Sequence, residues 1–188
     1  DHADNAAGGQ REGQVFKQQL VAIGFGQVGR FDHLAAKAFR HLNNARYIDY
    51  FMVAREDQLA QFYNFRIFDA AQLNNHGWVV TKTKIAYLAP AMMQEQVIIR
   101  TQLIHMSDSK LVVEGQMLNQ TGQRLKSVVW IEFAYVDLAT GRTGQHPDSL
   151  MDLFRAVVVD DVYAQPYDER VDNLKAAFRK PAAEPSTT

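Results

Sequence analysis

Polar side chains suited to holding a polarised carbonyl group stand directly before an apolar helical pattern. His41, Asn43 and Asn44 lie in the segment HLNNARYIDYFMVARE, which runs from His41 to Glu56. An Asn side chain can accept a hydrogen bond from an orphan N–H of a first helical turn, so we expect Asn43 or Asn44 to cap the helix. Apolar residues then recur at spacings of three and four, which is typical of a helix with one buried face. They are Ile48, Phe51, Met52, Leu59, Phe62 and Tyr63.

A change of sequence period after this helix predicts a run of strands. The helical pattern ends at about Phe65, and later residues alternate between apolar and polar and are rich in β-branched and aromatic types. Thr121–Gly122 is a hairpin signal, and Ser107–Asp108 is expected to form another turn. An earlier strand is expected between Phe16 and Val28. The four later strands are expected at Trp78–Leu88, Val97–Met106, Leu111–Asn119 and Leu125–Asp137.

This order of elements predicts an α+β fold in which an antiparallel sheet wraps around one long helix. The sheet then has a second face and edges that need a cover, so we expect a dimer or larger assembly. Two amphipathic helices are expected after Pro147, one containing Leu150 to Val157 and one containing Val171 to Phe178. One face of the last strand should carry Leu125, Val129, Ile131, Phe133 and Tyr135.

The chain divides into four expected segments. Residues 1–13 are polar and expected to be disordered, 14–147 form the main domain, 148–180 form a C-terminal helical extension, and 181–188 form a flexible tail. A length of 188 residues is enough for one domain with a sizeable core.

Composition excludes several classes of function. Net charge is −1, so no overall field would recruit nucleic acid. There is no cysteine, which excludes a disulfide framework, a thiolate nucleophile and cysteine zinc sites. No apolar run is long enough to span a bilayer. These features favour a cytoplasmic protein without a membrane span.

Three sequence landmarks, in order, resemble those of hot-dog-fold thioesterases, the group that includes acyl-CoA thioester hydrolases and 4-hydroxybenzoyl-CoA thioesterase. The family segment G-H-V-N-N-A-x-Y is matched at His41, Asn43, Asn44, Ala45 and Tyr47. Tyr87-Leu88-Ala89-Pro90 resembles the family's Y-L-x-P turn, and Phe133-Ala134-Tyr135-Val136-Asp137, followed by Thr140-Gly141, resembles its last strand. The resemblance covers roughly residues 41–147 and implies a hot-dog fold with extra C-terminal helices.

The resemblance also implies a catalytic acid, and this chain departs from the family there. The family's Asp lies four residues before the His, where this chain has Lys37, and the alternative acidic position has Ala35. The family glycine directly before the His is Arg40. A Lys acts as a general base only when its pKa is strongly lowered. The usual catalytic carboxylate is therefore missing.

Two other carboxylates are candidates for the catalytic role. Asp32 lies nine residues before His41 and could reach the site if residues 32–39 hold an extra helical turn; otherwise it caps that short helix. Glu56 lies on the long helix, and some hot-dog thioesterases use a helix Glu. Its alternative role is a solvated charge paired with a base such as Arg55.

The remaining candidates would bind rather than attack the substrate. His41 could orient the substrate or donate to an oxyanion, or could be a structural hydrogen bonder. One of Asn43 and Asn44 is expected to cap the helix, and the other could bind a carbonyl or a water. Tyr47 is expected to be core or wall of the site. The backbone N–H groups of residues 45–47, at the positive end of the helix dipole, would suit a thioester oxyanion.

These residues support two functions. The first is hydrolysis of an acyl-CoA or acyl-carrier-protein thioester in lipid metabolism, by a homodimer or homotetramer that needs no metal or cofactor beyond the CoA or carrier of the substrate. The alternative is a catalytically degenerate hot-dog protein that binds such a thioester without hydrolysis, with Lys37 and Arg40 contacting the phosphates. Metal-ligand spacing is absent among His33, His76, His105 and His146.

A glycine-rich motif offers a third interpretation. Gly24, Gly26 and Gly29 fit G-x-G-x-x-G after a strand-like segment, which is the local pattern of a dinucleotide phosphate turn. A dinucleotide-binding domain needs further alternating strands and helices, whereas this chain continues into one helix and consecutive strands. We therefore favour a first strand bent by glycines.

Overall fold

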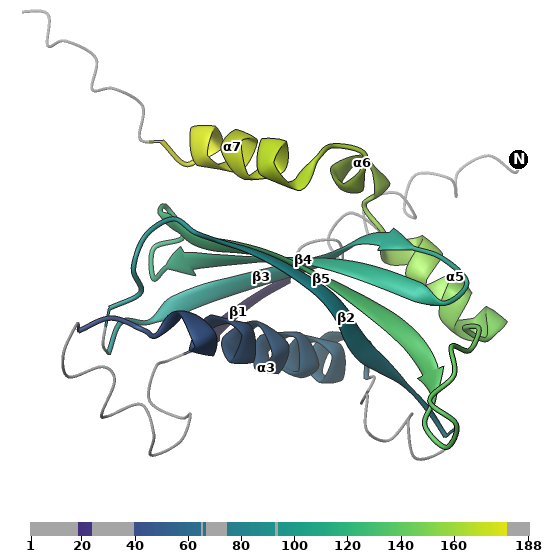
Figure 1. Cartoon of the computed structure of the whole chain (residues 1–188). Coiled ribbons are helices and arrows are strands. Elements are labelled where there is room, and N and C mark those ends of the chain that lie inside the picture. Colours follow the sequence, from purple (N-terminus) through teal and green to yellow (C-terminus); the bar gives the residue numbers. More distant parts are fainter. Residues whose placement is uncertain (1–18, 24–39, 65, 67–74, 93, 180–188) are drawn as a thin grey trace, which may run out of the picture.

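The alternating segments form one curved antiparallel sheet with helices on both of its faces. The computed structural model describes residues 19–23, 40–64, 66, 75–92 and 94–179. The strand order is β1-β3-β4-β5-β2, and every pairing is antiparallel. In Figure 1, α3 lies below the sheet, α6 and α7 lie above it, and α5 lies at one end. The elements are β1 (Gln19–Ile23), α3 (Asn44–Tyr63), β2 (His76–Tyr87), β3 (Val97–Met106), β4 (Lys110–Asn119), β5 (Leu125–Asp137), α5 (Asp148–Val157), α6 (Asp160–Tyr163) and α7 (Tyr167–Ala177).

Asparagines cap both ends of the long helix α3. Asn43 has an extended backbone and caps the start, and Asn64 ends the helix in the left-handed conformation with φ of 49°.

The buried face of α3 differs from the predicted one. Phe51 is buried as expected, but Phe62 is exposed. The face turned to the sheet carries Tyr47, Tyr50, Phe51, Ala54 and Gln58, because tyrosine and glutamine side chains can be buried there when their polar ends find partners.

A glycine in β4 brings the helix close to the inner face of the sheet. A Cβ built on Gly115 would lie 2.6 Å from the ring of Phe51 and 2.8 Å from Val129. Only glycine leaves room for this approach. The cluster formed here, between α3 and the sheet, buries Val97, Ile99, Met117, Val129 and Ile131.

The outer face of the sheet is covered by α6 and α7, which removes one of the exposed surfaces expected from the sequence. Val162 of α6 and Val171 and Leu174 of α7 join a cluster with Ile104, Val128 and Trp130. Figure 1 shows both helices lying across the sheet on the side away from α3. The helix α5 instead packs through Met151 and Phe154 on Leu103, Leu111 and Val113.

The short helix α6, which begins with the exposed Asp160 and Asp161, was not among the predicted elements. One sequence expectation on this side of the sheet was wrong. Leu125 was expected to share a face with Val129 and Ile131, but it belongs to the outer cluster. The β4–β5 register shifts between Met117 and Leu118, next to Leu125, and such a shift changes the face that a side chain reaches.

The predicted strand boundaries agree closely with the structure. Val97–Met106 and Leu125–Asp137 agree residue for residue, β4 begins one residue before the prediction, and β2 begins two residues and ends one residue before it. β1 lies within the predicted range 16–28, whose remaining residues lie outside the described part. Both predicted turns are present, with Gly122 at φ of 71° in one and Ser107 accepting from Lys110 N in the other. Three predictions fall outside the described residues: the tails 1–13 and 181–188, the short helix at residues 32–39 and the glycine motif. Within the described part, no helix is long and apolar enough to cross a membrane.

Candidate functional site

The start of α3 is held against the loop that joins β2 to β3. Leu42 N donates to Ala91 O at 2.8 Å, and Ala91 N donates to the Tyr47 hydroxyl at 3.0 Å. Tyr87 at the end of β2 donates its hydroxyl to Asn44 O at 3.0 Å. The rings of Tyr47 and Tyr87 meet edge to face at 5.1 Å. The first and second sequence landmarks are therefore brought into direct contact, which places the candidate site at this corner.

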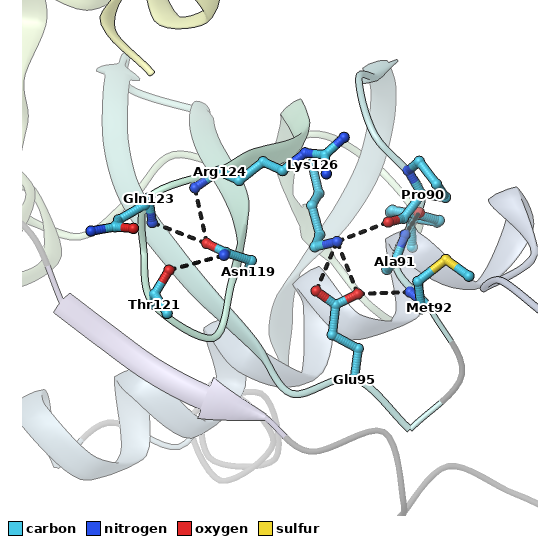
Figure 2. A network of polar contacts seen from close by, with 10 residues as sticks. Pro90, Ala91, Met92, Glu95, Asn119, Thr121, Gln123, Arg124 and Lys126 are labelled. Atoms are coloured by element: carbon cyan, nitrogen blue, oxygen red, sulfur yellow. Dashed lines mark hydrogen bonds and ion pairs between the residues drawn. The ribbon is translucent and has the colours of Figure 1, made fainter. Parts of the chain in front are cut away.

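A buried lysine braces the same loop from β5. Lys126 Nζ donates to Pro90 O at 2.8 Å and pairs with Glu95 at 2.8 Å, and Glu95 Oε2 in turn accepts from Met92 N at 2.8 Å (Figure 2). The Lys126 backbone carbonyl also accepts from Leu88 N. A buried ammonium needs such partners, because removing it from water is costly. No local sequence pattern indicates Lys126 and Glu95, because the two residues are 31 positions apart.

Asn43 is the cap of the helix, which decides between the two predicted candidates. Its Oδ1 accepts from Ala45 N at 3.0 Å, and its carbonyl accepts from Arg46 N at 2.9 Å. The expectation that the N–H groups of residues 45–47 serve an oxyanion is therefore wrong for Ala45 and Arg46, since the cap already uses them. Asn44, the exposed first residue of the helix, lies beside these groups with its carbonyl held by Tyr87.

His41 sits at the mouth of the site with a defined proton position. Its backbone pairs with Met92 in an isolated antiparallel bridge, and its Nδ1 lies 3.0 Å from Leu42 O. A carbonyl oxygen can only accept, so Nδ1 carries the proton of the neutral ring. Nε2 of this tautomer is an acceptor, so it cannot donate a hydrogen bond to an oxyanion.

Arg40 occupies a backbone conformation that normally favours glycine. Its φ is 57°, in the left-handed region, and its side chain is exposed. The residue that stands at the position of the family glycine thus adopts a conformation that glycine tolerates best. Lys37, the other predicted phosphate-binding cation, lies outside the described residues.

Tyr47 is a core residue, which is one of the two roles expected from the sequence. It is buried, and its hydroxyl accepts from Ala91 N. Burial raises its pKa, and the bond from Ala91 only partly offsets this effect. The hydroxyl therefore stays protonated and positions the loop rather than acting as a base.

Among the described residues, neither candidate carboxylate reaches the helix start of its own chain. Asp32 lies outside the described residues. Glu56 is half-buried, and in the described part it forms no ion pair with Arg55. It follows Asn44 by 12 residues in α3, or about 18 Å along the helix axis at 1.5 Å per residue. Asp49 and Glu95, which do lie nearby, are already paired with Arg46 and Lys126.

A polar chain runs beneath α3 that the sequence pattern did not reveal. Arg55 Nη1 donates to Thr101 Oγ1 at 3.4 Å, Thr101 donates to Gln58 Oε1, and Gln58 Nε2 donates to Ile99 O at 3.3 Å. Burial lowers the pKa of Arg55 to about 10, partly offset by Tyr63. The side chain remains charged at neutral pH, in a cavity otherwise walled by apolar residues such as Phe51, Val113 and Phe133.

Comparison with known families identifies the class of protein. A model of the thioesterase-like superfamily matches residues 28–156, more than half of the chain. The chain belongs to this superfamily, and membership supports thioester hydrolysis as the general activity. A comparison with curated proteins found no match.

Solved structures of similar shape confirm the hot-dog fold. A DHNA-CoA thioesterase from Staphylococcus aureus has a TM-score of 0.60 at 16% identity, covering 87% of this chain and 96% of that one. A 1,4-dihydroxy-2-naphthoyl-CoA thioesterase from Synechocystis has a TM-score of 0.62 at 10% identity, covering 73% and 96%. A thioesterase superfamily protein from Jannaschia has a TM-score of 0.63 at 8% identity, covering 75% and 93%. At these identities the likeness establishes the fold alone.

Proposed function

We propose that the protein hydrolyses an acyl-CoA or acyl-carrier-protein thioester at the amino end of α3. The observation that carries this proposal is the contact between the helix start and the β2–β3 loop, made by Leu42, Tyr47 and Tyr87. It creates a rigid corner in a chain of the thioesterase-like superfamily. Rigid support is what a site needs to hold a carbonyl in one orientation.

Asn44 is the proposed donor to the thioester carbonyl. Its backbone N–H stands at the positive end of the helix dipole, and its side-chain amide is exposed beside it. Water attacks the carbonyl carbon, and the negative charge moves to the carbonyl oxygen, where these donors stabilise it. The C–S bond then breaks, and the thiolate leaves and takes up a proton.

A carboxylate must accept the proton of the attacking water, and two routes are open to it. Asp32 would supply it from the same chain. Glu56 would supply it to the site of a partner subunit, because it lies too far along α3 to reach Asn44 of its own chain. Arg40 and Lys37 would contact the phosphates of the CoA or carrier.

The proposed assembly is a homodimer or homotetramer that pairs through β2. This strand has 12 residues and forms one edge of the sheet. Val79 and Val80 on it are 42% and 47% exposed. Long edges with exposed apolar side chains are normally paired or covered. The predicted cytoplasmic location stays a prediction.

One observation favours the alternative, a protein that binds an acyl thioester without hydrolysis. Asp49 and Glu95, the described carboxylates beside the helix start, are both neutralised by cations. Without Asp32 or Glu56 at the site, the corner could hold a carbonyl but not activate water.

Turnover of a panel of acyl-CoAs and acyl-carrier proteins tests the proposal. We expect Asn44→Ala to reduce kcat by about 100-fold, the usual effect of losing one oxyanion donor. Either Asp32→Asn or Glu56→Gln should lower kcat by a similar factor or more. Asp57→Asn, which alters an exposed carboxylate next to Glu56, is the matched control and should keep full activity. Saturable binding with no hydrolysis above background would instead establish the alternative.

A further inference from the structure

A second cavity lies on the opposite face of the sheet from the candidate active site. It has a volume of about 370 Å³ and opens between the outer side of β2 and β5 and the junction of α6 with α7. Figure 1 shows this junction above the sheet, with α3 on the other side. The volume falls within the range of roughly 300–1,000 Å³ that is usual for small-molecule sites.

Aromatic rings form the apolar part of the cavity. Trp130 is only 5% exposed, and its ring centroid lies 5.5 Å from that of Tyr163 and 5.3 Å from that of Tyr167. The indole N–H of Trp130 is used by Glu114, and the Tyr167 hydroxyl donates to Val128 O. Trp130 and Tyr167 are nearly buried in the lining, whereas Tyr163 is 38% exposed and offers an accessible ring surface beside Trp130, which suits a planar apolar group.

Lysines supply the polar part of the cavity. Lys82 and Lys84 are exposed, lie two residues apart on β2 and line the opening. Lys84 Nζ lies 5.8 Å from the centroid of the Tyr167 ring, and within the described residues neither lysine forms an ion pair. The one carboxylate in the lining, Glu132, already accepts from Thr81 at 2.7 Å and pairs with Lys110 at 3.2 Å.

The pairing of Glu132 leaves the cavity with an excess of positive charge. The Thr81 hydrogen bond lowers the pKa of Glu132, burial opposes this, and Lys110 and Lys82 lower it further, so Glu132 is ionised at neutral pH. Glu132 therefore faces both Lys110 and Lys82, and with Lys84 added this one carboxylate leaves a net positive charge at the opening. Cations beside aromatic surfaces match a ligand that is both planar and anionic.

We propose that this outer cavity binds a small aromatic anion, with its ring against Trp130 and Tyr163 and its negative group between Lys82 and Lys84. The proposal is independent of the proposed hydrolysis, because the cavity and the α3 start lie on opposite faces of the sheet. Two sources share this chemistry: an aryl carboxylate, and the phosphorylated adenosine of a nucleotide.

Tryptophan fluorescence can test the site directly, because Trp130 lies in the cavity and Trp78 is the other tryptophan of the chain. In the full-length protein with Trp78→Phe, titration with 2-naphthoate or adenosine 3′,5′-bisphosphate should quench Trp130 saturably. The ligand that binds identifies the source. Isothermal titration of the unmutated protein with the same two ligands serves as a second measurement if Trp78→Phe fails to fold.

Charge variants distinguish specific binding in the cavity from non-specific attraction to the protein surface. Lys82→Ala with Lys84→Ala should weaken binding by about tenfold or more, since charge-assisted hydrogen bonds are lost. Lys82→Arg with Lys84→Arg should retain it. The matched control, Arg155→Ala with Lys175→Ala, removes two exposed positive charges elsewhere and should bind normally. Equal affinity for the neutral 2-naphthamide, equal affinity of the alanine variant, or no saturation by either anion below about 1 mM would overturn the proposal.

Discussion

At the scale of single residues, Arg40 stands where the resembling family has glycine, in a backbone conformation that glycine tolerates best. Its left-handed backbone, with φ of 57°, places His41 in register with Met92. A residue with a Cβ loses about 1–2 kcal/mol in this conformation relative to a right-handed one. The stored strain should therefore be released by glycine.

We expect Arg40→Gly to stabilise the protein by up to about 1 kcal/mol, because relief of strain exceeds the extra entropy that glycine loses on folding. The free energy of unfolding in urea measures this change. Arg40→Ala keeps the Cβ and should leave stability unchanged, so the difference between the two variants isolates the backbone effect. A glycine variant no more stable than the alanine variant would contradict this account.

At the scale of elements, α7 is fixed to the sheet by one buried ion pair. Glu114 of β4 is fully buried, and Arg170 of α7 donates to both of its oxygens at 2.9 Å. Burial alone would raise the pKa of Glu114, but hydrogen bonds from Arg170, Trp130 and Gln116 lower it overall. The carboxylate therefore stays charged and depends on Arg170 for compensation.

Arg170→Met should destabilise the protein by about 3–5 kcal/mol, because it leaves a buried charge without its partner. Adding Glu114→Gln should recover most of this loss, since the amide oxygen still accepts from Trp130 and carries no charge. Urea unfolding of both single variants and the double variant measures the coupling. If the two losses simply add, the ion pair does not anchor α7 in the way proposed.

The helix α5 is joined to the sheet by an aromatic cluster centred on His146. Trp78 Nε1 donates to His146 Nε2 at 3.0 Å, so Nδ1 carries the proton and donates to Ser107 O at 3.1 Å. Phe154 of α5 meets the imidazole edge to face at 5.2 Å. Burial lowers the pKa of His146 below the ordinary value of 6.5, and contacts with Ser107 and Asp108 only partly offset this.

Stability should therefore fall as pH is lowered from about 7.5 through the ordinary histidine range. The unfolded chain binds a proton at His146 before the folded protein does, so the free energy of unfolding rises with pH in this window. The contribution of one group is at most about 1.4 kcal/mol per pH unit. His146→Gln, measured by urea unfolding at several pH values, should show a shallower dependence than the parent chain. Identical slopes would assign the pH dependence to other groups.

The sequence predicted elements well and the polar partners within them poorly, for a physical reason. Alternation and turn residues act locally, so the strand of Val97–Met106 was predicted to the residue. The contact of Tyr87 with Asn44 joins residues 43 apart, and Arg170 with Glu114 joins residues 56 apart. No local pattern specifies such pairs. The sequence narrowed the cap to Asn43 or Asn44, because capping is a local interaction. Only the structure shows that the N–H groups of Ala45 and Arg46 are both bonded to Asn43.

At the scale of the whole molecule, the two sheet edges decide how copies can assemble. The outer face is covered by α6 and α7 and the inner face by α3, so the sheet can be extended at its edges, β1 and β2. We favour β2, because it has 12 residues and β1 has five. Val79 and Val80 would lie at such a junction. The same junction would decide whether Glu56 of one subunit can serve the helix start of another.

We expect the protein to be dimeric by light scattering, and Val79→Lys with Val80→Lys to weaken the dimer by at least about tenfold, because lysines on a strand edge oppose pairing. Leu138→Lys, at a residue 50% exposed beyond the end of β5, is the control and should remain dimeric. An unchanged dimer in the edge variant would exclude β2 as the interface.

The rate of thioester hydrolysis per protomer, measured in the same edge variant, then separates the two catalytic routes. If Glu56 acts across the interface, the rate falls in step with the dimer fraction. If Asp32 acts within its own chain, the monomer keeps its activity.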